Sequence, residues 1–375
     1  MDYEQIRKVI ESCHLNFLIG SGASKPHLGT LGTIEQLLTE LAQKPQSDEK
    51  IVVDASIKRH YFDVSIKGNL DIEKGTDSKL IAAKEEYRKF FESLHIILNK
   101  RKSNLISKQV NVFTTNMDLF MEYAMEEMEF SFNDGFAGRL KPVFGTENFN
   151  NTIKKTSSHY EYQSDVPLCN LYKLHGSVNW RYEDSKILFD HGLSILKEVT
   201  AKMGDIKAYN TIEYIDKKGK WHTNTMPKLF SSVPTKSAVH DDFLESYNKL
   251  IMINPTKEKF ETTTRDLTFY ELLRMYSNQL EKENSVLFVF GFSFADEHIR
   301  EITKRVASSN PTLLIIIFAF DNASKIAIEK EISLRSNIKF IFDEKDAINY
   351  SLATINENYF AKLAEDLEKG IKPAI

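Results

Sequence analysis

Four short polar motifs contain residue types that could do chemistry, and each follows a short apolar run. In chain order they are Gly20-Ser21-Gly22-Ala23-Ser24, Thr115-Asn116-Met117-Asp118, His175-Gly176-Ser177 and Gly291-Phe292-Ser293-Phe294-Ala295-Asp296. Such apolar runs are typical of buried strands. Ligands of open α/β sheets bind outside the carboxyl ends of the strands, so we expect the four motifs to contribute to one site.

The first motif could bind a diphosphate. Gly20 and Gly22 allow a tight turn and a close approach of the backbone, while amides and the hydroxyls of Ser21 and Ser24 could bind phosphate oxygens. The motif is neither G-x-G-x-x-G nor a P-loop, because no Gly-Lys-Ser/Thr follows. A plain tight turn explains the same residues equally well.

The second motif could bind an amide or a sugar. The Asn116 side chain can donate and accept hydrogen bonds at once, and the Asp118 carboxylate could hold an amide NH2 group. Either residue could instead cap the helix expected from Leu119 to Met128. For this motif taken alone, capping is the favoured interpretation.

The third motif places a histidine at the end of a strand. His175 suits a general base whose pKa lies near the working pH, and Gly176 keeps space open beside it. A hydrogen-bonded structural histidine is the equally weighted alternative.

The fourth motif could hold a ribose through the hydroxyl of Ser293 and the carboxylate of Asp296. The same two residues satisfy the Ser-x-x-Asp capping pattern of a helix start. A purely structural role, as a helix cap, is therefore a strong alternative for this motif.

The elements that must position these motifs alternate between strands and helices. Strands are expected at 16–19, 110–114, 171–174, 286–290, 312–320 and 338–342, with helices at 2–13, 34–41, 79–99, 119–128, 270–280, 296–307 and 323–333. This alternation predicts an α/β fold, with a Rossmann-like parallel sheet and helices on both faces. The apolar stripe of helix 79–99 is interpreted as core packing rather than as an oligomer interface.

No internal repeat or low-complexity linker divides the chain. We expect a single core over residues 1–375, with helical or irregular insertions at about 43–105 and 185–280. The stretch 43–78 is polar and mixed and is predicted to be an insertion or partly irregular, and 131–170 is rich in loops. A hairpin is expected from 212–215 and 221–225.

Composition excludes several classes of protein. The 375 residues include 49 Lys and Arg against 53 Asp and Glu, a net charge of −4, so direct nucleic-acid or membrane binding is not expected. The longest apolar run, 313–320, is far shorter than the ~20 residues that cross a bilayer, and charges interrupt the first ten residues. A cytoplasmic location is therefore expected. Cys13 and Cys169 cannot supply a disulfide framework or a four-thiolate zinc site.

Together, the segments GSGAS, TTNMD, KLHGSVNW and VFGFSFADEHI resemble the NAD-binding core of the sirtuin superfamily. That family has a Gly-Ala-Gly-x-Ser phosphate loop, a Thr-x-Asn-x-Asp motif, a catalytic His-Gly and a late Gly-x-Ser. The matching residues lie between 16 and 298, and the stretches between the motifs do not align. The resemblance implies that NAD is the substrate, that the bond between nicotinamide and ribose is cleaved, and that no metal is needed.

The resemblance also implies a role for each matching residue. Asn116 would order the ribose or the attacking water, and His175 would be the base. Asp118 would hold the carboxamide of nicotinamide, and Ser293 would lie near the adenosine ribose. The implied NAD-binding residues are Gly20, Ser21, Gly22, Ala23, Ser24, Thr115, Asp118, Gly291, Ser293 and Asp296.

The sequence departs from protein-deacylating sirtuins in three ways. It has no Cys-x-x-Cys pairs for their zinc ribbon, Lys25-Pro26-His27 replaces their Asp-Phe-Arg segment, and the region from 175 to 286 is longer than a peptide-docking site needs. A deacylase is therefore disfavoured. The chain looks more like the bacterial sirtuin-like NAD hydrolases of antiphage defence, and Ile253-Asn254-Pro255-Thr256 with the following helix and strand fits that branch.

An unregulated NAD hydrolase would kill its host, and the core occupies nearly all 375 residues. We therefore expect homo-oligomerisation and a separate sensor, such as a hexameric DNA-translocase-type ATPase. Three alternatives stay open. The protein could be a deacylase, an ADP-ribosyltransferase, or a non-catalytic scaffold that binds NAD or ADP-ribose.

Overall fold

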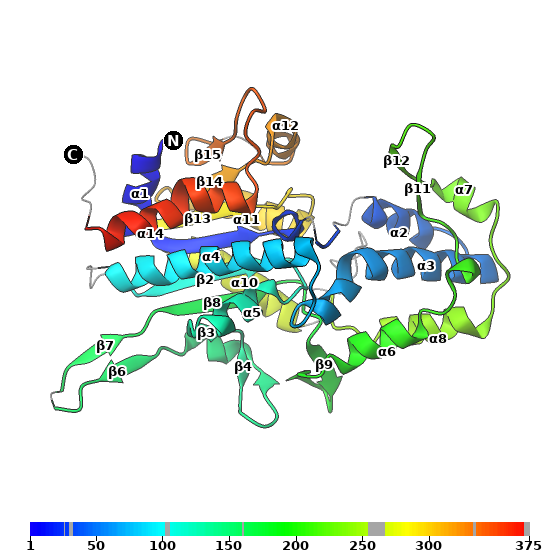
Figure 1. The fold of residues 1–375 in the computed structure, drawn as a ribbon, viewed down its shortest axis with the longest axis horizontal. Coiled ribbons are helices and arrows are strands. Elements are labelled where there is room, and N and C mark those ends of the chain that lie inside the picture. The colour runs from blue at the N-terminus through cyan, green and yellow to red at the C-terminus, as the bar shows by residue number, and fades with distance from the viewer. Residues whose placement is uncertain are drawn as a thin grey trace.

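Seven parallel strands form the central sheet, in the order β15-β14-β13-β1-β2-β8-β3 (Figure 1). The structure is a computed structural model that describes residues 1–25, 27–29, 33–101, 106–159, 161–253, 267–332 and 335–370. The predicted α/β fold with a Rossmann-like parallel sheet is confirmed. The strands are β1 (His14–Ile19), β2 (Gln109–Thr114), β3 (Phe132–Asn133), β8 (Leu168–Lys173), β13 (Ser285–Phe290), β14 (Leu314–Phe318) and β15 (Ile338–Ile341).

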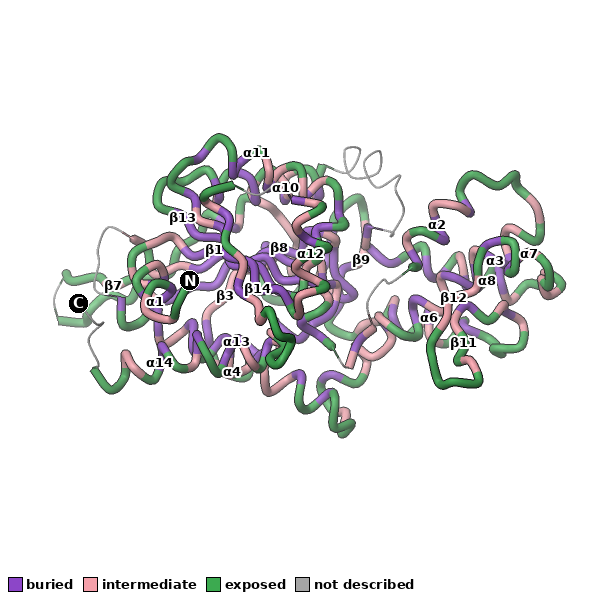
Figure 2. Tube along the Cα trace, turned by 90° about the horizontal axis from the view of Figure 1, so that it is seen from above, coloured by how far each residue is buried: buried purple, intermediate pink, exposed green. Residues whose placement is uncertain are grey.

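Helices cover both faces of this sheet because the strand side chains alternate between two apolar clusters. Phe17 and Ile19 of β1 belong to the cluster on one face, and Leu18 belongs to the cluster on the other. Figure 2 shows the strands as the most buried part of the chain. The first face is covered by α1 (Tyr3–Ser12), α4 (Ser78–Lys100), α5 (Phe120–Glu127), α13 (Leu352–Ile355) and α14 (Ala361–Glu368), and the second by α10 (Leu267–Leu280), α11 (Glu297–Ser309) and α12 (Asn322–Glu331).

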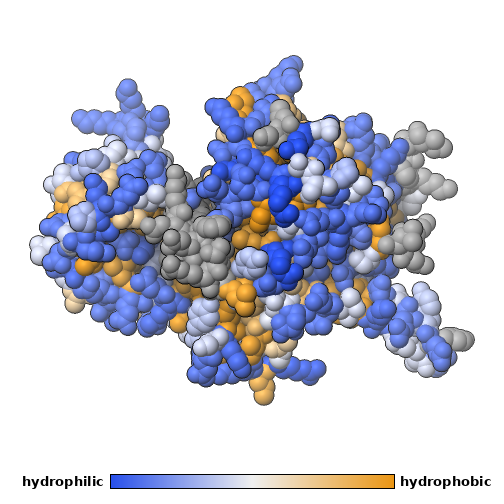
Figure 3. Space-filling view, turned by 180° about the vertical axis from the view of Figure 1, so that it is seen from behind, coloured by the Kyte–Doolittle hydropathy of each residue, from blue (hydrophilic) through white to orange (hydrophobic). Residues whose placement is uncertain are grey.

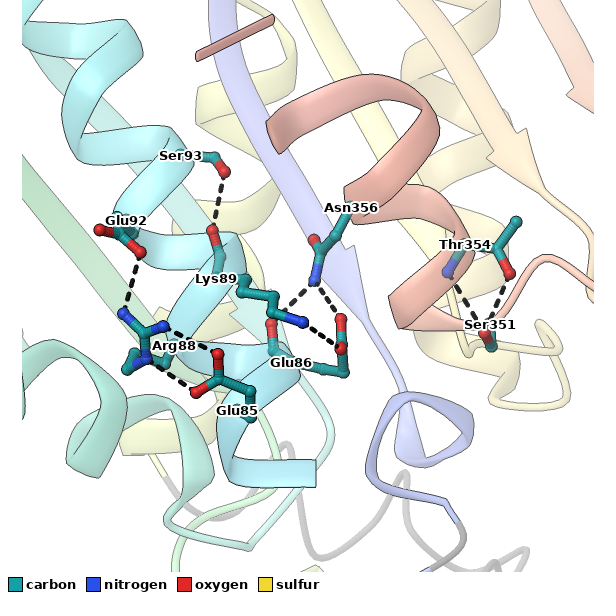
Figure 4. A network of polar contacts seen from close by, with 9 residues as sticks. All are labelled: Glu85, Glu86, Arg88, Lys89, Glu92, Ser93, Ser351, Thr354 and Asn356. Carbon is teal, nitrogen blue, oxygen red and sulfur yellow. Dashed lines mark hydrogen bonds and ion pairs between the residues drawn. The ribbon is translucent and has the colours of Figure 1, made fainter. Parts of the chain in front are cut away.

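The long helix α4 packs its apolar stripe into the core of its own chain, as predicted. Tyr87, Phe90 and Leu94 are completely buried. On its outer side, Arg88 pairs with Glu85 at 2.8 Å and with Glu92 at 2.9 Å (Figure 4). The side-chain amide of Asn356 donates to the backbone carbonyl of Glu86 at 2.8 Å, which ties α4 to the π-helical segment Asn356–Phe360 before α14 (Figure 4).

A helical lobe lies beside the sheet (Figure 1). It contains α2 (Ile34–Ala42), α3 (Asp48–Tyr61), α6 (Ser194–Lys202), α7 (Met226–Phe230) and α8 (Ala238–Tyr247). Within 43–78, which is predicted to be an insertion or partly irregular, residues Asp48–Tyr61 form the regular helix α3. Ser47 caps this helix by accepting from the Lys50 amide at 3.2 Å. Its buried Val52, Val53 and Ile57 are β-branched, a composition that obscures a helix in the sequence.

Short antiparallel sheets complete the fold. One has the order β4-β5-β10-β9, with bounds Phe136–Ala137, Val143–Phe144, Lys186–Phe189 and Trp180–Glu183. The hairpins are β6 (Lys154–Thr156) with β7 (Gln163–Asp165), and β11 (Glu213–Ile215) with β12 (Trp221–Thr223). The second hairpin confirms the one predicted at 212–225.

The remaining predicted elements agree with the structure to within a few residues at their ends. The predicted feature at 253–256 lies outside the described residues except for Ile253. No helix in the described ranges has the length and apolar character needed to cross a bilayer. Hydrophilic residues cover much of the face shown in Figure 3.

Candidate functional site

The sheet changes the direction of its strand order between β1 and β13. From β1 the chain moves to β2 and β8 on one side, and it later returns to β13 on the other side. The carboxyl ends of strands at such a switch point form the ligand crevice of open α/β sheets. The first and fourth motifs occupy this point, because they directly follow β1 and β13.

Three glycines bring these two motifs into backbone contact. The Gly22 amide donates to the Gly291 carbonyl at 2.9 Å, and the Gly20 amide donates to the Phe290 carbonyl at 3.1 Å. A Cβ on Gly20 would lie 2.3 Å from the Gly291 carbonyl oxygen. Gly291 itself has a φ of +64°, which favours glycine. The loop therefore requires glycine for the close approach of two strand ends, a role that the sequence did not reveal.

The second motif meets the first in a buried polar cluster. The Ser24 hydroxyl donates to the Asp118 carboxylate at 2.7 Å, and it lies 3.0 Å from the hydroxyl of Tyr87. The Asn116 amide group donates to the Gly20 carbonyl at 3.2 Å and to the Ser24 hydroxyl at 3.3 Å. Burial, then the nearby Asp118 carboxylate, raises the pKa of the Tyr87 phenol well above its usual range.

One polar atom of this cluster has no partner in the described parts of the chain. It is the side-chain carbonyl oxygen of Asn116, which is buried and accepts no hydrogen bond there. Buried acceptors normally have a donor. This unpaired oxygen is therefore suited to accept from a hydroxyl of a ligand or from a water molecule.

The third motif meets the fourth through a histidine–carboxylate pair. His175 Nε2 lies 3.1 Å from Asp296 Oδ2, and the side chains are 12% and 6% exposed. The other oxygen of Asp296 accepts from the Ile299 amide at 3.1 Å and so caps α11. The cap predicted from the sequence is thus present, but the N-cap residue that accepts the hydrogen bond is Asp296 rather than Ser293, and its carboxylate also faces His175.

Local backbone contacts fix the position of His175. The Ile253 amide donates to the His175 carbonyl at 3.0 Å. Gly176 has a φ of +82°, and a Cβ there would lie 2.2 Å from the Ile251 carbonyl oxygen. The Val178 amide donates to the Met117 carbonyl at 3.2 Å, which links this motif to the second one.

A buried lysine, which the sequence analysis did not single out, lies under the site. Lys173 Nζ is 2.9 Å from the Glu122 carboxylate and donates to the backbone carbonyls of Asn116 and Asp118. Burial raises the pKa of Glu122, although Lys173 opposes the shift. In the sequence, the only sign that Lys173 is special is its charge within a mostly apolar strand.

Three of the predicted residues, Ser21, Thr115 and Ser293, lie outside the buried polar cluster. Ser293 is exposed, and its hydroxyl accepts from the Ala295 amide of its own turn at 3.4 Å. Ser21 and Thr115 are partly exposed, whereas Ala23 is buried and its amide donates to the Gly20 carbonyl. No group of three or more His, Cys, Asp or Glu side chains in the described ranges is arranged to hold a metal.

Residues 242–341 match the family model described as SIR2-like domain. This match confirms the predicted resemblance over a stretch that includes the fourth motif, and it supports an NAD-dependent function of the sirtuin type in general. The first three motifs lie outside the matched residues.

A similar solved structure comes from a study of the structural basis for the mechanism and regulation of Sir2 enzymes. It covers 98% of this chain and 97% of its own, with 12% identity and a TM-score of 0.35. A search of the curated proteins finds no match.

Proposed function

We propose that this sirtuin-like protein hydrolyses NAD at the bond between nicotinamide and ribose, releasing nicotinamide and ADP-ribose. The observation that carries the proposal is the convergence of four motifs, far apart in the chain, on one edge of the sheet. Ser24 contacts Asp118, Gly22 contacts Gly291, and His175 contacts Asp296. The SIR2-like match supports the choice of NAD as the substrate.

The residues of the site fit this chemistry. The nicotinamide of NAD is already a good leaving group, so the protein has to orient it and stabilise an oxocarbenium-like state. The free acceptor on Asn116 can hold a ribose hydroxyl or the attacking water. His175 can take the proton of that water or hydroxyl, with the carboxylate of Asp296 stabilising the resulting imidazolium.

Binding of the diphosphate is assigned to the exposed side of the first motif. The amides of Gly22 and Ala23 donate to carbonyls of the protein. Ser21 lies on the partly exposed part of the loop. We therefore expect its hydroxyl to contribute more to binding of the diphosphate than these two amides do.

The test is the release of nicotinamide from NAD, resolved by chromatography. We expect His175→Ala to reduce turnover by about 10²–10⁴-fold, the range that a positioned general base contributes. Asn116→Ala should reduce it by about 10²–10³-fold, the range for loss of a positioned hydrogen-bonding group. His222→Ala is the matched control, because His222 pairs with Asp216 at 2.9 Å on the β11–β12 hairpin. Turnover that survives both site substitutions would refute the mechanism.

We further propose that this activity depletes cellular NAD in antiphage defence and that a separate partner, with assembly into an oligomer, switches it on. The need to restrain a hydrolase of a central cofactor supports this part of the proposal. Turnover should rise when the product of the neighbouring gene is added. Turnover that depends strictly on an acylated or acceptor protein would instead indicate a deacylase or an ADP-ribosyltransferase.

A further inference from the structure

The ammonium group of Lys173 lies beneath the turn that carries Asn116 and Asp118. Lys173 comes from the end of β8, the strand next to β2, and the turn follows β2 directly. Its Nζ donates to the Asp118 carbonyl and lies 3.4 Å from the Asn116 carbonyl. These are backbone contacts, so they set the course of the turn whatever its side chains bind.

A carboxylate from the following helix balances the lysine charge. Glu122 lies in the first turn of α5, and its Oε1 is 2.9 Å from Lys173 Nζ. The lysine side chain is 2% exposed and the glutamate side chain 12% exposed. A buried charge is costly unless it is paired, so the pair makes it possible to keep a strong donor under the turn.

We propose that Lys173 is a positioning residue, which holds the backbone of the Asn116–Asp118 turn so that the two side chains face the substrate, with Glu122 compensating its charge. The inference rests on the proposed NAD hydrolysis for its kinetic consequence. Among the hydrogen bonds and ion pairs of the described residues, the Lys173 side chain has none to the first, third or fourth motif. The backbone carbonyl of Lys173 accepts from the Gly176 amide at 3.2 Å, a contact that a change of side chain does not remove. The side chain therefore acts through the turn.

The alternative is that the pair only stabilises the fold. Lys173→Met alone does not separate the two roles, because it leaves the Glu122 carboxylate buried without its partner and is expected to lower the melting temperature. The double variant Lys173→Met, Glu122→Gln removes both charges and should melt near the wild-type temperature. The double variant still lacks the Lys173 ammonium group, which donates to the carbonyls of Asn116 and Asp118.

We expect the double variant to lose kcat while KM changes little, because the turn carries the groups that act in the transition state. A misplacement of about 1 Å can lower the rate on the order of 10²-fold. Glu122→Gln alone keeps the lysine under the turn and should retain near-wild-type kcat. Lys249→Met, Glu198→Gln is the matched control, since that pair is 2.7 Å apart on the exposed surface of the helical lobe.

Amide hydrogen exchange gives a readout that does not need turnover. The Asn116 amide donates to the Thr114 hydroxyl at 3.0 Å, and the Leu119 amide donates to the Asn69 side chain at 3.1 Å. Both should exchange faster in the folded double variant, while the amides of β1 should not. A folded double variant with wild-type kcat and wild-type exchange in the turn would overturn the proposal.

Two further outcomes are informative. If the double variant does not fold, Glu122→Gln decides the question. Loss of kcat together with faster hydrogen exchange of the turn amides in Glu122→Gln would overturn the proposal, and wild-type values of both would support it. If the wild-type protein releases no nicotinamide, the proposed function fails, but the exchange measurement still decides whether Lys173 holds the turn.

Discussion

At the scale of single residues, the Asp296 carboxylate has two roles that can be separated. One oxygen caps α11, and the other lies 3.1 Å from His175. Asp296→Asn should keep the cap, because Asn and Asp cap helices about equally well. It should lose the charge that stabilises a protonated His175. We therefore expect an unchanged melting temperature and turnover reduced by about 10²-fold, the lower end for a positioned base.

A second N-cap aspartate provides the control. Asp321 caps α12 by accepting from the Ser324 amide at 2.7 Å, and it belongs to none of the four motifs. Asp321→Asn should leave the release of nicotinamide unchanged. Equal activity of both variants would show that Asp296 does not assist His175.

The pH dependence of stability can be predicted from His14, the first residue of β1. Burial lowers the pKa of its imidazole, and the positive charges of Lys282 and Arg101 lower it further. Below the ordinary histidine pKa of about 6.5, the unfolded chain therefore binds a proton that the folded chain excludes. The free energy of unfolding should fall as the pH drops below that value.

Urea unfolding at a series of pH values between neutrality and mild acid measures this effect. His95, whose pKa is also lowered by burial, contributes in the same direction. His14→Gln should therefore reduce the slope, and His14→Gln with His95→Gln should reduce it further. An unchanged slope in the double variant would contradict the assignment.

At the scale of elements, an asparagine ladder crosses the sheet. Asn16, Asn111 and Asn170 are register partners on β1, β2 and β8. The Asn111 amide donates to the Asn16 side chain at 2.9 Å, and the Asn170 amide donates to the Asn111 side chain at 3.1 Å. A shift of one residue would bury these amides without partners, so the ladder favours the register that places the second and third motifs side by side.

Replacing the middle residue should be more damaging than replacing all three. Asn111→Leu leaves buried groups of Asn16 and Asn170 unpaired, and each such group costs about 1–3 kcal/mol. Replacing all three with leucine removes the unpaired groups and should lower the free energy of unfolding less. Chemical denaturation of the two variants measures the difference. A triple variant less stable than Asn111→Leu would contradict this account of the ladder.

Much of the fold could be predicted because strand and helix periodicity is strong in the core. The apolar runs before the motifs specify β1, β2, β8 and β13, and their order along the chain places the motifs at strand ends. Contacts between distant segments could not be predicted in the same way. Lys173 under the turn and Tyr87 beside Ser24 depend on packing, and a one-dimensional pattern assigns Tyr87 only to the core face of its helix.

At the scale of the whole molecule, the candidate site follows the carboxyl ends of strands in the parallel sheet. A helical lobe lies beside the sheet (Figure 1). The buried cluster that includes Phe17 also contains Val53 and Phe243 of the lobe, so apolar packing is continuous between the two parts. We propose that residues 1–375 form a single core, with insertions at about 43–105 and 185–280 that supply most of the helical lobe.

We propose that water attacks the ribose of NAD as nicotinamide leaves. This proposal is tested most directly by incubating the protein and NAD, with and without the neighbouring gene product, in water enriched in heavy oxygen. We predict nicotinamide and free ADP-ribose in equal amounts, with the heavy oxygen on the ribose carbon that held nicotinamide. Tight NAD binding with no nicotinamide released, even with the partner present, would contradict the proposal.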